Sequence, residues 1–282
     1  MNENDFVEMQ ALTFNIFGSS YWPQTKRRMQ QMGESLVNLT DELGLDFITL
    51  QETFFNSYRD ELIVKPWQER FHHHSYADQK KWWQVFGSGL TTLSRHEIIH
   101  TIFEPYKTSK VVDAFSNKGI LLTRIKLPTG VELDLYNTHT QASYINPKGR
   151  NTVRERQIEQ LSAFIQKESD GSRPILLMGD LNTTEDHHGY KKLVQEQGKL
   201  ANESHQFKDI MRRLFPDRLL HPLTTLIKSN PLQERKLDHV FLRTGHRFEW
   251  DRENTSSELY DFDLSDHRAI LSRISLQKVP AY

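Results

Sequence analysis

The sequence contains no cysteine, so it can form no disulfide bond, no thiolate metal site and no cysteine nucleophile. It also contains no run approaching the ~20 apolar residues that a membrane-spanning helix requires. Residues 1–5 are acidic and include no apolar segment of the kind found in secretory signals. We therefore expect no transmembrane segment and a cytoplasmic location, or secretion if a signal has been removed.

A marked excess of charge is missing as well, since 36 Lys and Arg residues face 37 Asp and Glu residues, for a formal net charge of −1. This balance argues against a protein whose main affinity comes from wrapping nucleic-acid phosphates, although a local basic patch is compatible with a neutral total. There is also no internal repeat, low-complexity tract or linker. With 282 residues and 37% hydrophobic content, we predict one globular domain over residues 1–282.

What the sequence does contain is a short apolar run, within residues 174–182, that ends abruptly in a carboxylate and an amide. Its boundaries, Pro174 and Gly179, are typical of a buried strand. Gly179 permits a turn or a close backbone approach, so Asp180 and Asn182 should emerge together at the strand end. Because a buried carboxylate needs a cation, a donor or solvent, the stretch predicts a site. On its own, it also fits a strand followed by an ordinary Asp/Asn turn.

Polar residues of the same kind follow other predicted strands, and this repetition strengthens the prediction. Side chains spread so widely along the chain must converge to make one site, which favours a single domain. The polar sets at the other strand ends are Asn15, Gln51 and Glu52, Asn137 through His139, Asp238 and His239, and Ser265 through His267.

Apolar residues at three- and four-residue spacing predict helices over residues 25–43 and 152–167. A helix over residues 58–67 is predicted to be interrupted by Pro66. The turn at residues 128–130 predicts a hairpin between the strands that flank it.

The last third of the chain is less regular. Residues 183–186 are predicted to cap a helix that runs to about residue 198. Residues 199–225 read as loop with a short helix near residues 210–215. Two strands, at residues 236–242 and 269–274, are predicted to be separated by an acidic, irregular stretch.

Two aromatic clusters precede residue 87. The histidine triplet at residues 72–74 is disfavoured as a metal site, because adjacent side chains point in different directions. Trp82 and Trp83, flanked by Lys80 and Lys81, are better suited to an interface, since indole rings favour the boundary between water and lipid head groups. Even so, we expect one of the two rings to pack inward.

The side chains at the strand ends are rich in hard oxygen ligands and lack sulfur or clustered imidazole. Such a set suits Mg²⁺ or Mn²⁺ better than Zn²⁺. A magnesium site with few carboxylates completes its shell with water and substrate phosphate, which indicates phosphoester chemistry. The set comprises Asn15, Glu52, Asp180, Asn182 and Asp266, with His139 and His267.

At the strand end within residues 174–182 and the five other polar strand ends named above, the sequence resembles the endonuclease/exonuclease/phosphatase superfamily. The resemblance covers nearly the whole chain. Six short motifs in the right order are far more specific than any one of them. The resemblance implies an α/β fold (α+β in some schemes), built as a four-layer, DNase I-like sandwich of two packed mixed β-sheets flanked by helices. It also implies one metal-dependent site at the strand ends.

Within the superfamily, further features resemble the neutral, Mg²⁺-dependent sphingomyelinases. They are the stretches at residues 87–98, 116–119 and 138–142, together with Asp113 and Lys118, which match the regulatory Asp/Lys pair of that branch. This resemblance implies a phospholipid substrate at a membrane surface, with Mg²⁺ as the cofactor and Mn²⁺ as a possible substitute.

The resemblance also implies a role for each residue. Glu52 would be the principal metal ligand, with Asn15 beside it and Asp266 supporting the metal or its waters. His267 would act as the general base on water, and Asp238 would orient its imidazole and raise its basicity.

The remaining residues would act on the substrate. Asp180 and Asn182 would position the water and the phosphoryl oxygens, and His139 would donate to a phosphoryl or leaving oxygen. Lys118 would supply positive charge and Asn117 a neutral donor for the phosphate.

Three functions stay open on the sequence alone. The first, which we favour, is a monomeric phosphodiesterase of phospholipase C type that hydrolyses sphingomyelin, or a related choline phospholipid, to ceramide and phosphocholine. The second is a nuclease or another phosphoesterase acting on nucleic acid, nucleotide or sugar or inositol phosphate, which the near-neutral charge disfavours without excluding. The third is a catalytically inactive binding module, which the complete set of polar strand ends argues against.

Overall fold

The computed structural model describes residues 6–18, 25–109, 114–142, 147–184, 187–199, 208–209 and 237–279, and folds them into two packed β-sheets. The first sheet runs in the order β11 (Phe248–Tyr260), β12 (Ala269–Lys278), β1 (Phe6–Asn15), β2 (Phe47–Gln51), β4 (Thr91–Ser94) and β3 (His73–Tyr76). The second runs in the order β5 (Glu97–Pro105), β6 (Gly119–Lys126), β7 (Glu132–His139), β8 (Ile175–Asp180), β10 (Asp238–Arg243) and β9 (Lys208–Asp209).

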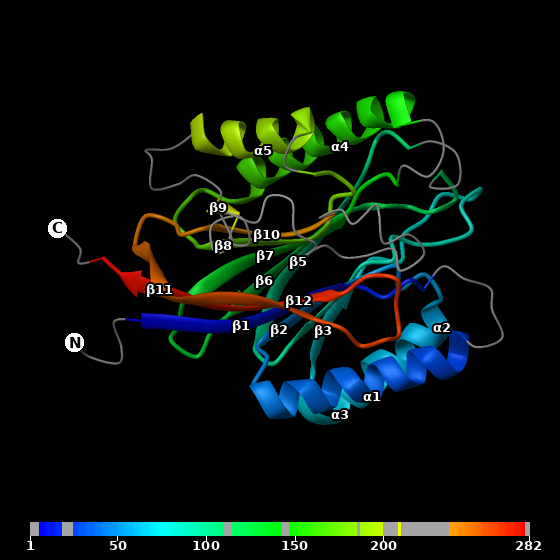
Figure 1. Ribbon diagram of the computed structural model, residues 1–282, viewed down its shortest axis with the longest axis horizontal. Helices are drawn as coiled ribbons and strands as arrows, with labels where there is room; N and C mark the ends of the chain where they lie inside the picture. The colour runs from blue at the N-terminus through cyan, green and yellow to red at the C-terminus, as the bar shows by residue number, and fades with distance from the viewer. Residues whose placement is uncertain are drawn as a thin grey trace.

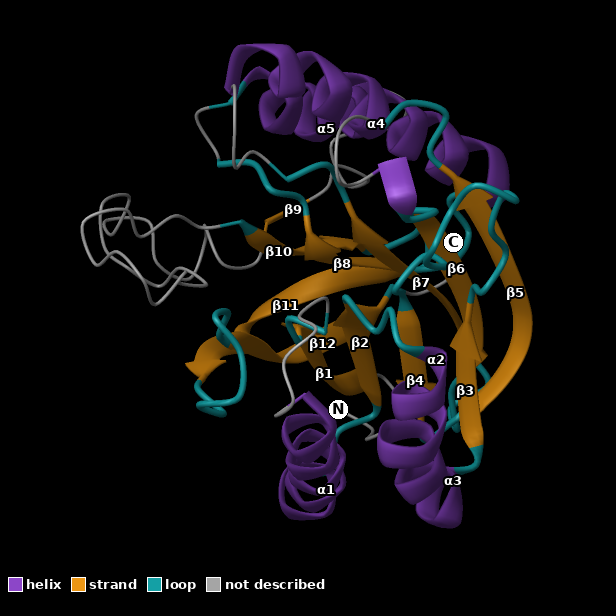
Figure 2. Ribbon diagram, turned by 90° about the vertical axis from the view of Figure 1, so that its right-hand side faces the viewer, coloured by secondary structure: helices purple, strands orange, loops and turns teal. Residues whose placement is uncertain are grey.

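Helices cover the outer face of each sheet (Figures 1 and 2). The first sheet carries α1 (Thr25–Leu43), α2 (Asn56–Tyr58), the π-helix η2 (Arg59–Val64) and α3 (Lys65–Phe71), and the second carries α4 (Pro147–Glu168) and α5 (His188–Lys199). The result is a sandwich of four layers, which confirms the predicted fold class. The helix predicted over residues 25–43 is also confirmed.

The central strands of each sheet are buried on both faces, and this explains their continuous apolar runs. Between the sheets, Phe47 of β2 packs in one cluster with Leu135 of β7 and Met178 of β8. On the outer faces, Met32 of α1 joins the cluster under the first sheet and Leu161 of α4 joins the cluster under the second.

Parallel pairing at the centre of each sheet brings the polar strand ends together. In the first sheet β1 and β2 are parallel, with Asn15 opposite Gln51. In the second sheet β7 and β8 are parallel, with His139 opposite Asp180, and the antiparallel strand β10 begins with Asp238 opposite that same Asp180. The ends of the parallel strands and the start of β10 therefore share one edge of the sandwich.

The structure corrects two predictions. The stretch predicted to be irregular contains β11, a long edge strand whose buried Phe248 and Trp250 alternate with polar residues, and whose pairing with β12 shifts register between Asp251 and Ser256. Its sequence is polar because only one face of an edge strand is covered. Pro66 does not interrupt a helix, because it lies in the first turn of α3, where its missing N–H is tolerated.

Other boundaries differ by a few residues. Helix α4 begins at Pro147 rather than near residue 152, and α5 begins at His188, two residues after the residues 183–186 that are predicted to cap it. The predicted hairpin over the turn at residues 128–130 is confirmed by the antiparallel pairing of β6 with β7. The short helix predicted near residues 210–215 lies outside the described residues.

Gly179 permits the close approach of β7 and β8 just before the polar strand ends. Its φ is +141°, and a Cβ at this position would overlap the backbone carbonyl oxygen of Thr138. The predicted need for glycine therefore comes from both conformation and space.

Replacing Gly179 with alanine should lower the free energy of unfolding by about 3 kcal/mol or more, because the substitution combines backbone strain with a clash against a strand. The matched control is Gly130→Ala, where φ is +78° and nothing lies within 4 Å of the added Cβ. That variant should lose only about 1 kcal/mol. Denaturant titration measures both, and equal losses would refute a role for the contact with Thr138.

Candidate active site

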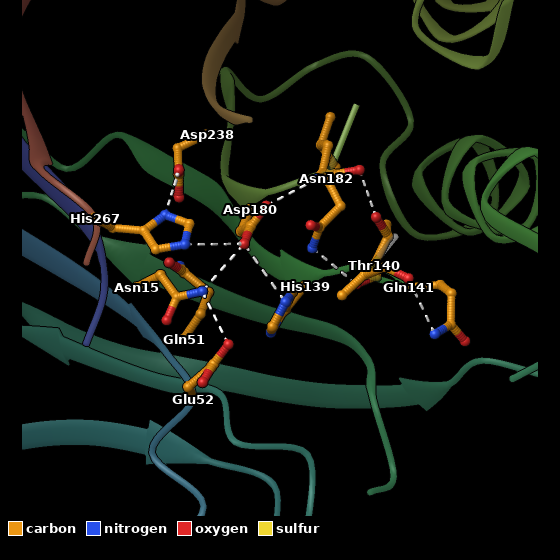
Figure 3. A network of polar contacts seen from close by, with 12 residues as sticks. Asn15, Gln51, Glu52, His139, Thr140, Gln141, Asp180, Asn182, Asp238 and His267 are labelled. Carbon is orange, nitrogen blue, oxygen red and sulfur yellow. Dashed lines mark hydrogen bonds and ion pairs between the residues drawn. The ribbon is translucent and has the colours of Figure 1, made fainter. Parts of the chain in front are cut away.

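The polar side chains at the shared edge of the two sheets converge on one buried cluster (Figure 3). They come from strands far apart in sequence, and each is at most 7% exposed. The cluster consists of Asn15 from β1, Glu52 after β2, His139 from β7, Asp180 from β8, Asp238 from β10, and His267 before β12.

Asn15 links the carboxylates of the two sheets. Its Nδ2 donates to Glu52 Oε1 at 3.2 Å and to Asp180 Oδ2 at 3.0 Å. Its Oδ1 accepts the backbone N–H of Phe17 at 3.0 Å. Asn15 therefore holds two buried acids side by side, in addition to any role as a ligand.

Glu52 is the group most clearly prepared for a ligand. Its φ of +62° places a non-glycine residue in the left-handed region, a strained conformation that surrounding contacts must maintain. Among the described residues, its buried Oε2 has no hydrogen-bond partner. A buried carboxylate oxygen without a donor is unfavourable unless a cation or a substrate group completes it.

His267 and Asp238 form a hydrogen-bonded pair, with 3.0 Å between Nδ1 and Oδ2. This contact leaves Nε2 facing Asp180, whose Oδ2 lies 3.9 Å away. Burial lowers the pKa of His267, but the carboxylates of Asp238, Asp180 and Asp266 outweigh that effect and raise the pKa to about 10. The pair has the geometry of a base and its orienting carboxylate.

Asp180 lies between this pair and the other histidine. Burial and the charge of Asp238 raise its pKa to about 7, against the lowering effects of His267 and of hydrogen bonds from Asn182 and Asn15. The Asn182 backbone N–H donates to Asp180 Oδ1 at 2.8 Å. The backbone of Asn182 has a φ of +47°. The side chain of Asn182 donates from Nδ2 to the backbone carbonyl oxygen of Thr140 at 3.2 Å.

His139 is held as a neutral imidazole. Burial lowers its pKa well below the usual value, and the charges of Lys118 and His267 lower it further. Lys118 Nζ lies 3.1 Å from His139 Nε2 and donates to it, so the imidazole proton resides on Nδ1. Nδ1 is buried and has no partner among the described residues.

The residues predicted to bind phosphate lie beside this imidazole on the segment before β6. Asn117 and Lys118 are buried, but Asn117 Nδ2 donates to the carbonyl oxygen of Gln79 at 2.6 Å, so that amide also anchors a loop. Asp113, the other member of the predicted regulatory pair, lies outside the described residues. Trp82 and Trp83 are 92% and 51% exposed, so the expectation that one ring packs inward is wrong.

The donor set fits a divalent cation. Asp266 is half-buried, and burial raises the pKa of its carboxyl group. The charge of His267 lowers this pKa, whereas the charge of Glu52 raises it. Two acids that repel each other, with one oxygen of Glu52 unpartnered, make a site that a hard cation would stabilise. Oxygen and nitrogen atoms of Asp180, Asp238 and His267 also lie within 4.8 Å of one another and could hold an ion.

Arg28 is a residue that the sequence analysis missed. It donates from Nη1 to the carbonyl oxygens of Ile16 and Leu264, at 2.9 and 2.8 Å, and from Nη2 to that of Phe17 at 2.6 Å. It thereby joins the loop after Asn15 to the loop before Asp266. The available signal was a run of basic residues in the first turn of α1, where the helix dipole disfavours cations.

The chain is similar in sequence to a curated protein and in structure to two solved proteins. The chain is 27% identical over 289 residues to a putative neutral sphingomyelinase of Drosophila melanogaster, covering 97% of this chain and 62% of the fly protein. The chain thus spans less than two thirds of that relative. This match and the family model described below confirm the resemblance predicted from sequence.

Two solved structures share the fold. Sphingomyelinase C from Streptomyces griseocarneus superposes with a TM-score of 0.70 at 21% identity, covering 95% of this chain and 99% of that one. TDP2 from D. rerio, in complex with a single-strand DNA product, superposes with a TM-score of 0.66 at 16% identity, covering 95% and 98%. At this identity the likeness concerns the fold alone.

The family model described as Endonuclease/Exonuclease/phosphatase family matches residues 12–267. This range extends from β1 to the histidine of the buried pair, and so includes every strand end that contributes to the cluster. The chain therefore belongs to the endonuclease/exonuclease/phosphatase family.

Proposed function

We propose that this protein is a Mg²⁺-dependent phosphodiesterase of phospholipase C type that hydrolyses sphingomyelin, or a related choline phospholipid, to ceramide and phosphocholine. The observation that carries the proposal is the arrangement of three unpartnered groups in one buried cluster. Glu52 Oε2, His139 Nδ1 and Asp238 Oδ1 are all buried without a partner in the part of the chain that the structure describes. Similarity to a neutral sphingomyelinase over nearly the whole chain supports the choice of substrate.

The cluster would provide a base, a donor and ligands for a cation around Asp180. His267 Nε2 and His139 Nε2 lie 3.9 and 3.5 Å from Asp180 Oδ2. Asn15 links the same carboxylate to Glu52. In its neutral form, His267 would accept a proton at Nε2 from water, while Asp238 fixes the other nitrogen as the donor. The oxygen of that water would attack phosphorus, and the bond between phosphorus and the ceramide oxygen would break as the ceramide oxygen takes up a proton from solvent, to which His267 would later release the proton that it accepted. The water's second hydrogen stays on the new phosphate oxygen and then ionises to solvent.

The other residues would hold the phosphate. His139 would donate its Nδ1 proton in a hydrogen bond to a phosphoryl or leaving oxygen, and Lys118 would keep that imidazole neutral and correctly oriented. Glu52 and Asp266, with Asn15 beside them, would hold Mg²⁺. A cation bound there would neutralise charge that develops on the phosphoryl oxygens.

A nuclease is the second candidate, because a DNA-bound protein shares the fold almost as closely as the sphingomyelinase does. The two candidates differ in what lies around the same catalytic cluster. A single-strand nuclease would need a basic groove with stacking aromatics. The balance of 36 basic and 37 acidic residues gives no support to such a groove.

With Mg²⁺, the purified protein should release phosphocholine from sphingomyelin vesicles and leave single-stranded DNA intact. Exhaustive chelation should abolish this activity. Glu52→Gln keeps the shape of the side chain but removes its charge, so it should weaken Mg²⁺ binding about 10-fold or more and lower the rate with it.

The matched control is Glu97→Gln, which removes an exposed carboxylate at the start of β5. It should leave both calorimetric Mg²⁺ affinity and hydrolysis unchanged. DNA hydrolysis without phosphocholine release would select the nuclease, and full activity in chelator or in folded Glu52→Gln would remove the metal from the mechanism.

The pH dependence should identify the base. Only neutral His267 can accept a proton, so the rate should rise with pH through its pKa, which the neighbouring carboxylates place above the ordinary imidazole value. Asp238→Asn removes one of those charges and should move this limb to lower pH by about one unit or more while lowering the plateau rate.

His267→Ala should reduce kcat by about 10²-fold or more, with little change in Mg²⁺ affinity. The losses from His267→Ala and Asp238→Asn should not multiply in the double variant, because the two residues act as one unit. If His267→Ala retains the wild-type pH profile, His139 becomes the better candidate for the base.

A further inference from the structure

Several large apolar side chains on two neighbouring loops are exposed to solvent. Trp82 is 92% exposed, Phe115 53%, Val85 52% and Trp83 51%. Single exposed apolar residues are common, but four on two loops that are hydrogen-bonded to each other are not explained by folding. We call this set the aromatic platform, defined as Trp82, Trp83, Val85 and Phe115.

Backbone and ring contacts make the platform continuous. The backbone N–H groups of Val85 and Phe86 both donate to the carbonyl oxygen of Phe115, at 2.9 and 3.1 Å. The two indoles stack edge to face with centroids 5.6 Å apart. Lys81 Nζ lies 5.2 Å from the centre of the Trp83 ring, so a cationic group borders the apolar surface.

The loop that carries the exposed side chains of the platform is held in place by polar contacts. Gln84 is buried, accepts the Lys81 backbone N–H at 2.8 Å and donates to the carbonyl oxygen of Ser116 at 3.1 Å. Earlier in the same loop, Asp78 forms a two-pronged ion pair with Arg59 of η2. Arg59 Nη1 donates to Asp78 Oδ1, and Nη2 donates to Oδ2 at 2.9 Å. The indoles therefore stand on an ordered support rather than at the end of a loose loop.

The same support leads directly into the candidate active site. Asn117 and Lys118 follow Phe115 by two and three residues, and Lys118 contacts His139. On the other loop, Phe86 packs against Phe54 and Phe55, with ring centroids 5.6 and 5.7 Å apart, and those residues follow Glu52. A surface that contacts the platform would thus lie beside both the cation site and the phosphate-binding segment.

We propose that the aromatic platform docks on the surface of a phospholipid bilayer and presents the active site to lipid head groups; this rests on the proposed function. Indoles bordered by lysine suit the head-group region, where rings bury apolar area and ammonium groups meet phosphates. Among the described residues, no helix is long and apolar enough to cross a membrane.

Vesicle binding in chelator tests the platform without turnover. Wild-type protein should co-sediment with vesicles of phosphatidylcholine and sphingomyelin, and Trp82→Ala/Trp83→Ala should bind about 10-fold more weakly or worse. Phe115→Ala should lose affinity in the same assay. The matched control is Ile99→Ala, which removes an apolar side chain that is 39% exposed on β5, outside the platform, and it should bind as wild type does.

Hydrolysis with Mg²⁺ separates this proposal from the proposed function. The double tryptophan variant should lose about 10-fold more activity on vesicles than on a short-chain soluble sphingomyelin analogue. Unchanged vesicle binding, or equal loss on both substrates, would overturn the platform. Platform-dependent binding without hydrolysis of either substrate would uphold the platform and contradict the proposed function.

A second copy of this chain is the alternative occupant of the platform. Sedimentation velocity should show a monomer at micromolar concentration for both wild type and the double tryptophan variant. A wild-type dimer that dissociates in Trp82→Ala/Trp83→Ala would assign the surface to self-association and overturn the membrane proposal.

Discussion

A hydrogen bond from Gln51 Nε2 to Asn137 Oδ1, 2.9 Å long, joins the two sheets inside the apolar core, and the candidate site depends on the register that it fixes. Asn137 also donates to the carbonyl oxygens of Leu50 and Thr91, both in the first sheet. Leaving a buried amide without its partner costs about 1–3 kcal/mol, so the sheets cannot slide past each other without penalty. Because Gln51 precedes Glu52 and Asn137 lies two residues before His139, this register brings Glu52 and His139 to the same edge of the sandwich.

Charge is unevenly distributed across the cluster, and this asymmetry gives each half its chemistry. On one side, three carboxylates surround His267 and hold its proton strongly. On another, burial lowers the pKa of His139 and the charge of Lys118 lowers it further, so the two histidines are held in opposite protonation states. Glu52 Oε2 is left without a partner among the described residues, and the charge of Glu52 raises the pKa of Asp266, so a cation near both acids would be stabilising. The same buried edge thus combines a candidate base, a candidate hydrogen-bond donor and candidate metal ligands.

Much of this arrangement could be predicted from sequence, because it follows from strong local patterns. The spacing of Met29, Met32 and Leu36 predicts α1, and an apolar run that stops at Gly179 and Asp180 predicts a strand ending in a site. Strand ends meet wherever strands run parallel, so the sequence could also indicate which side chains converge.

Other features depend on contacts that no local pattern reports. Arg28 reaches Leu264 across 236 positions, and the proton position on His139 depends on Lys118, which is 21 residues away. The edge strand β11 is polar on its open face and therefore resembles a loop. The exposure of Trp82 depends on how Gln84 and Ser116 join two loops, and a pair of indoles in sequence fits a core equally well.

Direct attack by water on phosphorus is the central claim, and an isotope experiment tests it most directly. Sphingomyelin hydrolysed by the protein with Mg²⁺ in ¹⁸O-enriched water should give phosphocholine that carries one ¹⁸O atom and ceramide that carries none, as mass spectrometry would show. Heavy oxygen in ceramide would mean that the carbon–oxygen bond breaks, and phosphocholine without the label would mean that water is not the nucleophile. Either result would contradict the roles assigned to His267, Asp238 and Glu52.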